Sequence, residues 1–208
     1  MSASDYKDAA VQFLSKPENL EVALDVAELL EDVKDKLVLE FWHSLKDQVC
    51  KIQSELPAWS FGLDSDEKLL KGRYSGLHCV PKIAPNAQNF LMFCLRQEGD
   101  KIYQGVRWNK EVKTAFDELS KKVPQLSAIK DRLQDLSKEY AKPDTWYIGY
   151  KYLNKGRRLR EKTSLLRIQA GTLANEVADE FVELAKGLQK LVEEANSALA
   201  KIDPALGK

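Results

Sequence analysis

Apolar residues recur every three or four positions in the first quarter of the chain. This spacing predicts one amphipathic helix over Leu20 to about Leu56, or two helices with a bend, ended by Pro57. A shorter helix is expected over Asp5–Leu14, ended by Pro17. The periodic apolar positions are Val22, Val26, Leu29, Val33, Leu37, Phe41, Leu45, Val49 and Ile52.

Beyond Pro57 the pattern changes to short runs rich in β-branched and aromatic residues, separated by glycines. The segment Glu98-Gly99-Asp100 has the composition of a tight hairpin turn. In the run that follows it, Tyr103, Gly105 and Arg107 share one face. The predicted strands are Arg73–Val80, Phe90–Gln97 and Lys101–Trp108.

The second half of the chain returns to helical patterns, interrupted by one more strand. We expect a helix from Lys110 to Val123 with Asn109 as its cap, and another after Pro124 that ends near Tyr140. Thr145–Leu153 reads as a fourth strand. A last helix is expected over about Thr163–Ile202, with an apolar seam that can face the long N-terminal helix.

Together these elements predict a single α+β domain in which a small antiparallel sheet of about four strands packs against long N- and C-terminal helices. The expected division is helical over 1–56, β-rich over 57–108, helical over 109–142, a strand and basic loop over 143–156, and a long helix over 157–208.

Composition supports a helix-rich globular protein of 208 residues, 44% hydrophobic and 31% charged. The formal net charge is zero, but the charges are segregated. Twelve acids and four bases lie between Glu18 and Asp66, whereas nine bases and three acids lie between Lys68 and Lys113. We therefore expect an acidic side and a basic side.

Cys50, Cys79 and Cys94 cannot all pair within one chain, and the N-terminus has no apolar signal region. We therefore expect the reducing environment of the cytoplasm. No run of about 18 apolar residues occurs, so no membrane partner is expected.

The strongest functional signal is the stretch from Thr145 to Arg167, in which four aromatics precede seven cations. Aromatic rings stack on bases and cations neutralise phosphates, so this mixture is typical of a surface for nucleic acid or an acidic partner. The competing interpretation is that half of the aromatics face the core and the cations form a solvated face. The candidate nucleic-acid-binding residues are Trp146, Tyr150, Lys151, Lys155, Arg157, Arg158, Arg160 and Lys162, together with Arg107.

No catalytic or metal signature accompanies this stretch. The histidines and cysteines show no C-x-x-C or H-x-x-x-H spacing, so no metal and no cofactor are expected. A metal-dependent nuclease would need carboxylates and a lysine together, and the best candidates are Asp100, Glu111 and Lys113. Four acid-x-Lys triplets occur, about as many as chance gives at this composition, and Glu111 fits the start of a helix better than a strand.

Three short aromatic signatures suggest a family. They are Phe41-Trp42-x-x-Leu45, the strand sequence YQGVRW that ends at Trp108, and WYIGYKYL from Trp146. Their combination resembles the C-terminal region of bacterial and phage proteins of the PD-(D/E)XK nuclease superfamily. This chain is similar to a region of those proteins that lies outside the nuclease core and is accessory to it. The resemblance implies a link to DNA restriction, defence or counter-defence, without implying catalysis.

The sequence thus favours a non-enzymatic module that contacts nucleic acid, DNA rather than RNA, through a basic and aromatic surface. One alternative is a phage-type protein inhibitor or regulator that contacts a defence-system protein through its acidic helix face. The other is a small metal-dependent nuclease. The long helices also allow a homodimer.

Overall fold

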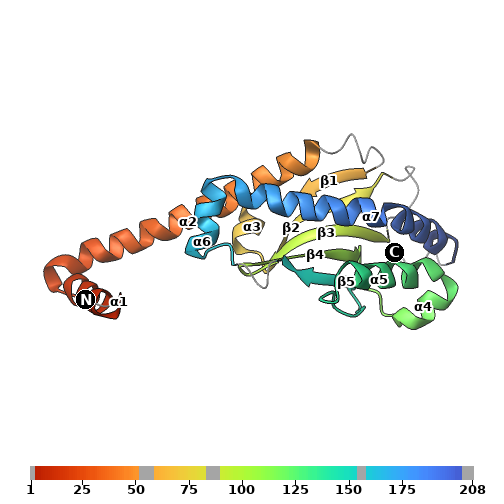
Figure 1. The fold of residues 1–208 in the computed structure, drawn as a ribbon, viewed down its shortest axis with the longest axis horizontal. Coiled ribbons are helices and arrows are strands. Elements are labelled where there is room, and N and C mark those ends of the chain that lie inside the picture. The colour runs from red at the N-terminus through yellow and green to blue at the C-terminus, as the bar shows by residue number, and fades with distance from the viewer. Residues whose placement is uncertain (1–2, 52–58, 83–89, 154–157, 203–208) are drawn as a thin grey trace. The chain divides into compact units, whose positions relative to one another are not determined.

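The computed structural model describes residues 3–51, 59–82, 90–153 and 158–202. Within these ranges the chain forms helices and one antiparallel sheet (Figure 1). The helices are α1 (Ala3–Leu14), α2 (Pro17–Lys51), α3 (Asp66–Lys71), α4 (Phe116–Lys122), α5 (Pro124–Leu136), α6 (Lys162–Gln169) and α7 (Thr172–Ile202). The strands are β1 (Trp59–Leu63), β2 (Tyr74–Pro81), β3 (Leu91–Glu98), β4 (Lys101–Trp108) and β5 (Tyr147–Tyr152).

The sheet is an antiparallel meander whose order in space, β1-β2-β3-β4-β5, is the order in the chain. The predicted α+β class and the four predicted strands are confirmed, and β4 has the predicted bounds. The hairpin between β3 and β4 turns at Gly99, whose φ of +58° suits glycine. The sheet has a fifth strand, β1, that was not predicted, because its five residues lie between Pro57 and a glycine-containing segment.

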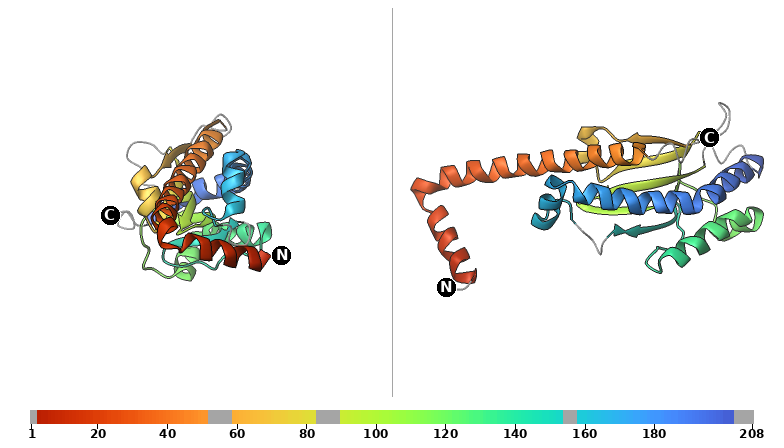
Figure 2. Two further views of the ribbon diagram at one scale, coloured as in Figure 1. Left: turned by 90° about the vertical axis from the view of Figure 1, so that its left-hand side faces the viewer. Right: turned by 45° about the horizontal axis from the view of Figure 1, so that its top comes forward.

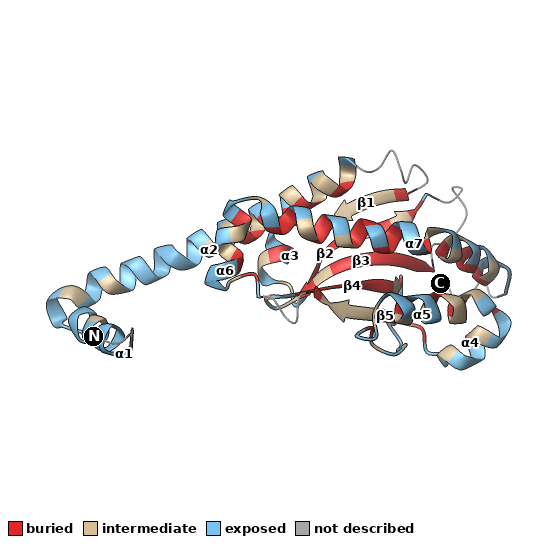
Figure 3. Ribbon diagram, viewed as in Figure 1, coloured by how far each residue is buried: buried red, intermediate tan, exposed pale blue. Residues whose placement is uncertain are grey.

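One face of the sheet is covered. α7 lies over β3 (Figures 1 and 2) and turns its apolar seam, including the fully buried Phe181, toward the core. Figure 3 shows this burial along the inner side of α7. From the sheet, Phe93, Leu95 and Leu77 contribute to this core, and none of them has any exposed surface. We call this the covered face.

Polar bonds fix the helices on the covered face. The Asn196 side chain on α7 accepts from the Phe90 and Leu91 amides and donates to the Leu91 carbonyl. On the later part of α2, Trp42 is buried and its Nε1–H donates to the Gln97 side chain at 2.8 Å. Buried donors and acceptors are costly when unpaired, so these bonds set the helix positions on the strands.

Two helical predictions need correction. Residues 109–115 form no helix, because the Asn109 amide bonds to the Phe90 carbonyl and the Val112 amide to the Thr145 carbonyl. The prediction of a single final helix is wrong as well. Gly171, with φ +70°, separates α6 from α7, a backbone turn that side-chain-bearing residues seldom make.

The chain divides into two compact units, Met1–Leu37 and Val38–Lys208, with the division inside α2. The second unit contains the sheet and its helices. In the first unit the periodic apolar positions of α2, such as Val22 and Leu29, are more than half exposed. No helix in the described ranges is both long enough and apolar enough to cross a membrane.

Candidate functional site

The face of the sheet opposite α7, which we call the open face, carries aromatic and charged side chains instead of aliphatic ones. Strand side chains alternate between the two faces, so the register decides which residues meet there. Across the strands, His78, Cys94, Gly105 and Tyr150 form one row, Arg96, Tyr103 and Tyr152 a second, and Met92, Arg107 and Tyr147 a third.

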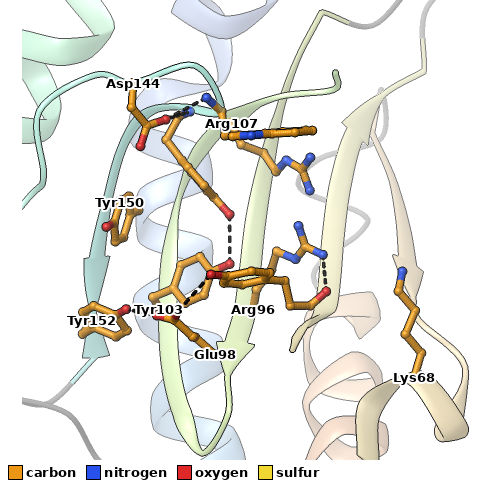
Figure 4. A pocket seen from close by; sticks show the side chains of 11 residues that line it. Lys68, Arg96, Glu98, Tyr103, Arg107, Asp144, Tyr150 and Tyr152 are labelled. Atoms are coloured by element: carbon orange, nitrogen blue, oxygen red, sulfur yellow. Dashed lines mark hydrogen bonds between the residues drawn. The ribbon is translucent and has the colours of Figure 1, made fainter. Parts of the chain in front are cut away.

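These rows surround a hollow of about 700 Å³. Figure 4 looks into it, with the tyrosines of β5 on one side and Arg96 and Arg107 on the strands beside them. Its volume lies within the roughly 300–1,000 Å³ typical of small-molecule sites. The lining residues are Lys68, Tyr74, Arg96, Glu98, Tyr103, Arg107, Asp144, Trp146, Tyr147, Tyr150 and Tyr152.

A cluster of tyrosines forms one side of the hollow. Tyr103 is buried at its centre, with ring centroids 5.9, 5.5 and 5.7 Å from Tyr147, Tyr150 and Tyr152 in edge-to-face geometry. Its hydroxyl bonds to that of Tyr147 at 2.9 Å. Burial, and then this bond, raise the pKa of Tyr103 far above the usual value, so it stays neutral. Edge-to-face contacts of this kind hold the cluster together without a covering helix.

Trp146 lies at the rim of the hollow and is 42% exposed. The Arg107 guanidinium carbon lies 5.6 Å from its ring centroid, a cation–π contact. Asp144 holds the start of β5 by accepting from the Trp146 and Tyr147 amides, each at 2.7 Å. An exposed aromatic ring beside a guanidinium can stack on a planar ligand.

Cations line the side of the hollow nearer β2 and β3 (Figure 4). Lys68 on α3 donates to Asp64 at 2.6 Å, and Arg96 donates to the Tyr74 carbonyl. Burial raises the pKa of Asp64, but its hydrogen bonds from Lys68 and Gly76 outweigh burial and leave the pKa below normal. Arg96 and Arg107 both line the hollow.

Glu98 marks one end of the hollow and is bound by tyrosine hydroxyls. Tyr152 and Tyr74 donate to its two carboxylate oxygens, and Arg73 lies 3.4 Å from one of them. The hydrogen bond from Tyr152, followed by that from Tyr74, lowers the pKa of Glu98. A negative charge therefore lies two residues from Arg96 on the same face of β3, and both charges border the hollow.

In the sheet, Gly105 lies opposite Cys94 on β3 and Tyr150 on β5. A side chain at Gly105 would meet the Gly149 carbonyl at 2.2 Å and the Tyr150 backbone at 2.8 Å. Glycine therefore permits the close approach of β5 to β4. Burial raises the pKa of Cys94 to about 11, so this thiol is no nucleophile at neutral pH.

The predicted binding residues divide into several groups. Arg107, Trp146 and Tyr150 meet in the hollow. Lys151 belongs to the opposite face, where its Nζ lies 5.5 Å from the Tyr140 ring. Arg158, Arg160 and Lys162 do not line the hollow. Arg158 lies 3.9 Å from Glu161, Arg160 lies 3.5 Å from Asp100, and Lys162 begins α6. Lys155 and Arg157 lie outside the described residues.

Sequence reasoning missed several residues of the hollow. Arg96, Glu98, Tyr74 and Lys68 lie on β2, β3 and α3, and Tyr147 and Tyr152 were noted only as part of the aromatic stretch. One signal was present, since Tyr103, Gly105 and Arg107 were placed on a common face. Extending that face to β3 would have needed the register of the hairpin at Gly99.

The residues of the nuclease alternative do not come together. Asp100 precedes β4 and Glu111 follows it, so a strand of eight residues, roughly 26 Å long, separates them. Lys113 lies beyond Glu111 in the same non-helical segment. In the part of the chain that the structure describes, no group of three His, Cys, Asp or Glu residues could hold a metal.

Comparisons with protein-family models, curated proteins and solved structures find no match to this chain. The likeness to the PD-(D/E)XK superfamily therefore stays a prediction.

Proposed function

We propose that this chain is a non-catalytic nucleic-acid-binding module that takes an unpaired strand on the open face of its sheet. The observation that carries the proposal is the hollow, in which half-buried tyrosines and the exposed Trp146 stand beside Arg96 and Arg107. Aromatic rings stack on bases of any sequence, and guanidinium groups bind phosphates.

An unpaired strand fits this surface better than a duplex. The aromatic rings line a concavity, and bases can enter it only when they are not stacked in a helix. The cations Arg158, Arg160 and Lys162 would extend the contact along the backbone of a longer strand. Following the resemblance, the module would act beside a nuclease or another part of a restriction or defence system.

The test is a titration with fluorescently labelled single-stranded and duplex DNA at two salt concentrations. Single strands should bind more tightly, and log affinity should fall with log salt by about 0.7 for each phosphate contact. Tyr150→Ala should weaken single-strand binding by about 1–3 kcal/mol. Tyr6→Ala is the matched control, because Tyr6 is 72% exposed and lies in the other unit.

A second pair of variants compares the hollow with the cations that follow β5. Arg107→Gln removes a cation of the hollow, whereas Arg158→Gln removes a cation that lies after β5 and outside the hollow. If only Arg158→Gln weakens binding, the open face is not the binding surface. If the parent binds neither form of DNA at low salt, nucleic-acid binding itself is wrong.

The protein-binding alternative is favoured by a different observation. Among the described residues, eleven of the sixteen large apolar side chains that are exposed belong to Met1–Leu37. Acids such as Asp25 and Glu28 lie between them on α2. Such a patch is typical of protein interaction sites. The partner at this patch could be a second copy of the chain. In that case light scattering across a concentration series should show a homodimer, and Leu24→Glu with Leu29→Glu should abolish it.

A further inference from the structure

The guanidinium groups of Arg96 and Arg107 are open to an anionic ligand. Arg96 gives one N–H to the Tyr74 carbonyl, and Arg107 gives its Nε–H to the Trp108 carbonyl at 2.9 Å. Each guanidinium carries five N–H donors, so most of them remain. Among the described residues neither group forms an ion pair, and the Asp64 carboxylate is already bonded to Lys68 and the Gly76 amide.

Both arginines line the hollow. Arg96 lies opposite Tyr103 and Arg107 lies four residues further along β4, roughly 13 Å in the strand direction. Gly105 lies midway along β4, and the β5 backbone lies against it, since a Cβ there would meet the Gly149 carbonyl at 2.2 Å. Both arginines also act on Cys94: burial raises the pKa of this thiol, and the positive charges of Arg107 and Arg96 oppose that rise. Both charges therefore act on the same part of the sheet.

We propose that the hollow binds a nucleotide carrying a terminal phosphate, with the phosphate between Arg96 and Arg107 and the base against Tyr150 and Trp146. This inference rests on the proposed function and specifies its ligand. A terminal phosphate carries a charge of about −1.5 to −2 near neutral pH, which two guanidinium groups can match. An internal phosphate of a strand carries only one negative charge.

The rest of the hollow fixes the orientation. Glu98 is ionised and held by Tyr152 and Tyr74, so it repels a phosphate from that end. On the β5 side, the Tyr150 hydroxyl has no hydrogen-bond partner among the described residues and is free to bond a base or sugar. The volume of about 700 Å³ suits a ligand of nucleotide size.

Two sources supply this chemistry, a free nucleoside monophosphate and the phosphorylated end of a strand. The experiment uses adenosine with adenosine 5′-monophosphate, and a short oligo-dA strand with 5′-phosphate, 3′-phosphate or neither. Affinities are measured by calorimetry on the full chain. We expect each phosphorylated form to bind roughly 10- to 100-fold more tightly than its unphosphorylated counterpart. A gain for the monophosphate assigns a free nucleotide, and a gain for the strand alone assigns a strand end.

Variants locate the phosphate. Arg107→Gln should remove most of the gain from phosphorylation, while Arg107→Lys should keep part of it, because lysine retains the charge but not the planar fork. Arg132→Gln, the same change on an exposed position of α5, should leave the gain intact. Arg96→Gln repeats the test on the other side, and its folding is checked by thermal denaturation because Arg96 also bonds to the β2 backbone.

The inference and the proposed function fail in different ways. If the parent binds phosphorylated and unphosphorylated strands equally, the terminal-phosphate site is wrong while strand binding stands. The same holds if the gain survives Arg107→Gln undiminished. If no strand binds in any form, but adenosine 5′-monophosphate does, the hollow is a nucleotide site and the strand-binding function falls. If nothing binds, both fall.

Discussion

The covered and open faces of the sheet are made by the same strands and differ in every chemical respect. On the covered face, Phe93 and Leu95 of β3 lie beneath α7 and have no exposed surface. On the open face their neighbour Arg96 lines the hollow, and Cys94 lies two residues before it on the same face. An antiparallel sheet needs only one packed face to be stable, so the second face is free to carry other chemistry.

What distinguishes the open face is how its aromatic side chains are held. Tyrosines there contact one another edge to face and share hydroxyl bonds, as Tyr103 does with Tyr147 and Tyr152 with Glu98. Their positions are thus set by a polar and aromatic network and not by a covering layer. The comparison teaches that stability should depend on the covered face and ligand binding on the open one.

The largest effect is expected from truncating the covered core. Phe181→Ala should lower the free energy of unfolding by about 3–5 kcal/mol, because Phe181 is fully buried and its removal leaves a cavity. Denaturant unfolding followed by circular dichroism measures it. Tyr150→Ala on the open face should cost clearly less. Equal losses would mean that the open face is part of the core.

A smaller effect is expected from the buried hydrogen bond of α2. Trp42→Phe removes the Nε1–H donor and leaves the Gln97 oxygen unpaired, which should cost about 1–3 kcal/mol. The same unfolding measurement applies. Gln97→Leu completes a double-mutant cycle, although it also removes the bond from Gln97 Nε2 to the Leu69 carbonyl. If the double variant loses less than the sum of the two single variants, the Trp42–Gln97 bond accounts for the difference; additive losses would contradict this.

The matched change on the open face is Tyr152→Phe. It removes the strongest hydrogen bond to Glu98 but leaves the ring in place, so stability should change by only about 0.5–1.5 kcal/mol. The pKa of Glu98 should rise toward its ordinary value, because that bond is the main cause of its depression. NMR titration of the Glu98 carboxyl group measures the shift, and an unchanged pKa would contradict the network.

The smallest effect concerns pH. Burial lowers the pKa of His78 below its usual value of 6.5. The negative charge of Asp64 opposes this change, and the positive charges of Arg96 and Arg107 add to it. The unfolded chain therefore binds the proton more readily than the folded one, so stability is fully present above about pH 6.5 and falls as the pH drops through the folded pKa. Midpoints of denaturation at neutral and mildly acidic pH should show the fall, and His78→Gln should reduce it.

The extent of prediction from sequence differs between local and long-range features. The four predicted strands were recognised from short runs of β-branched and aromatic residues and from the turn at Gly99, and α2 from its apolar period. Residues 109–115 were misread because backbone bonds to Phe90 and Thr145, both distant in sequence, hold them extended. The division of the last helix rests on Gly171, a residue that a helical pattern tolerates.

The site shows the same limit. Arg107, Trp146 and Tyr150 were found because they lie in compact aromatic and basic stretches. Arg96 and Glu98 were not, since nothing near them in sequence marks them as functional. Their part in the hollow comes from the pairing of β3 with β4, which places Arg96 beside Tyr103. Lys151 shows the converse, because strand alternation turns it away from its neighbour Tyr150.

The order of the sheet also bears on how the protein matures during translation. Each strand pairs with the one made just before it, so β1 to β4 can form as they leave the ribosome. Their apolar face, however, is covered by α7 only after α7 has been made, and α7 ends at Ile202, 94 residues after β4 ends at Trp108. At about 5–20 residues per second, that face stays unprotected for several seconds, long enough for a chaperone to engage it.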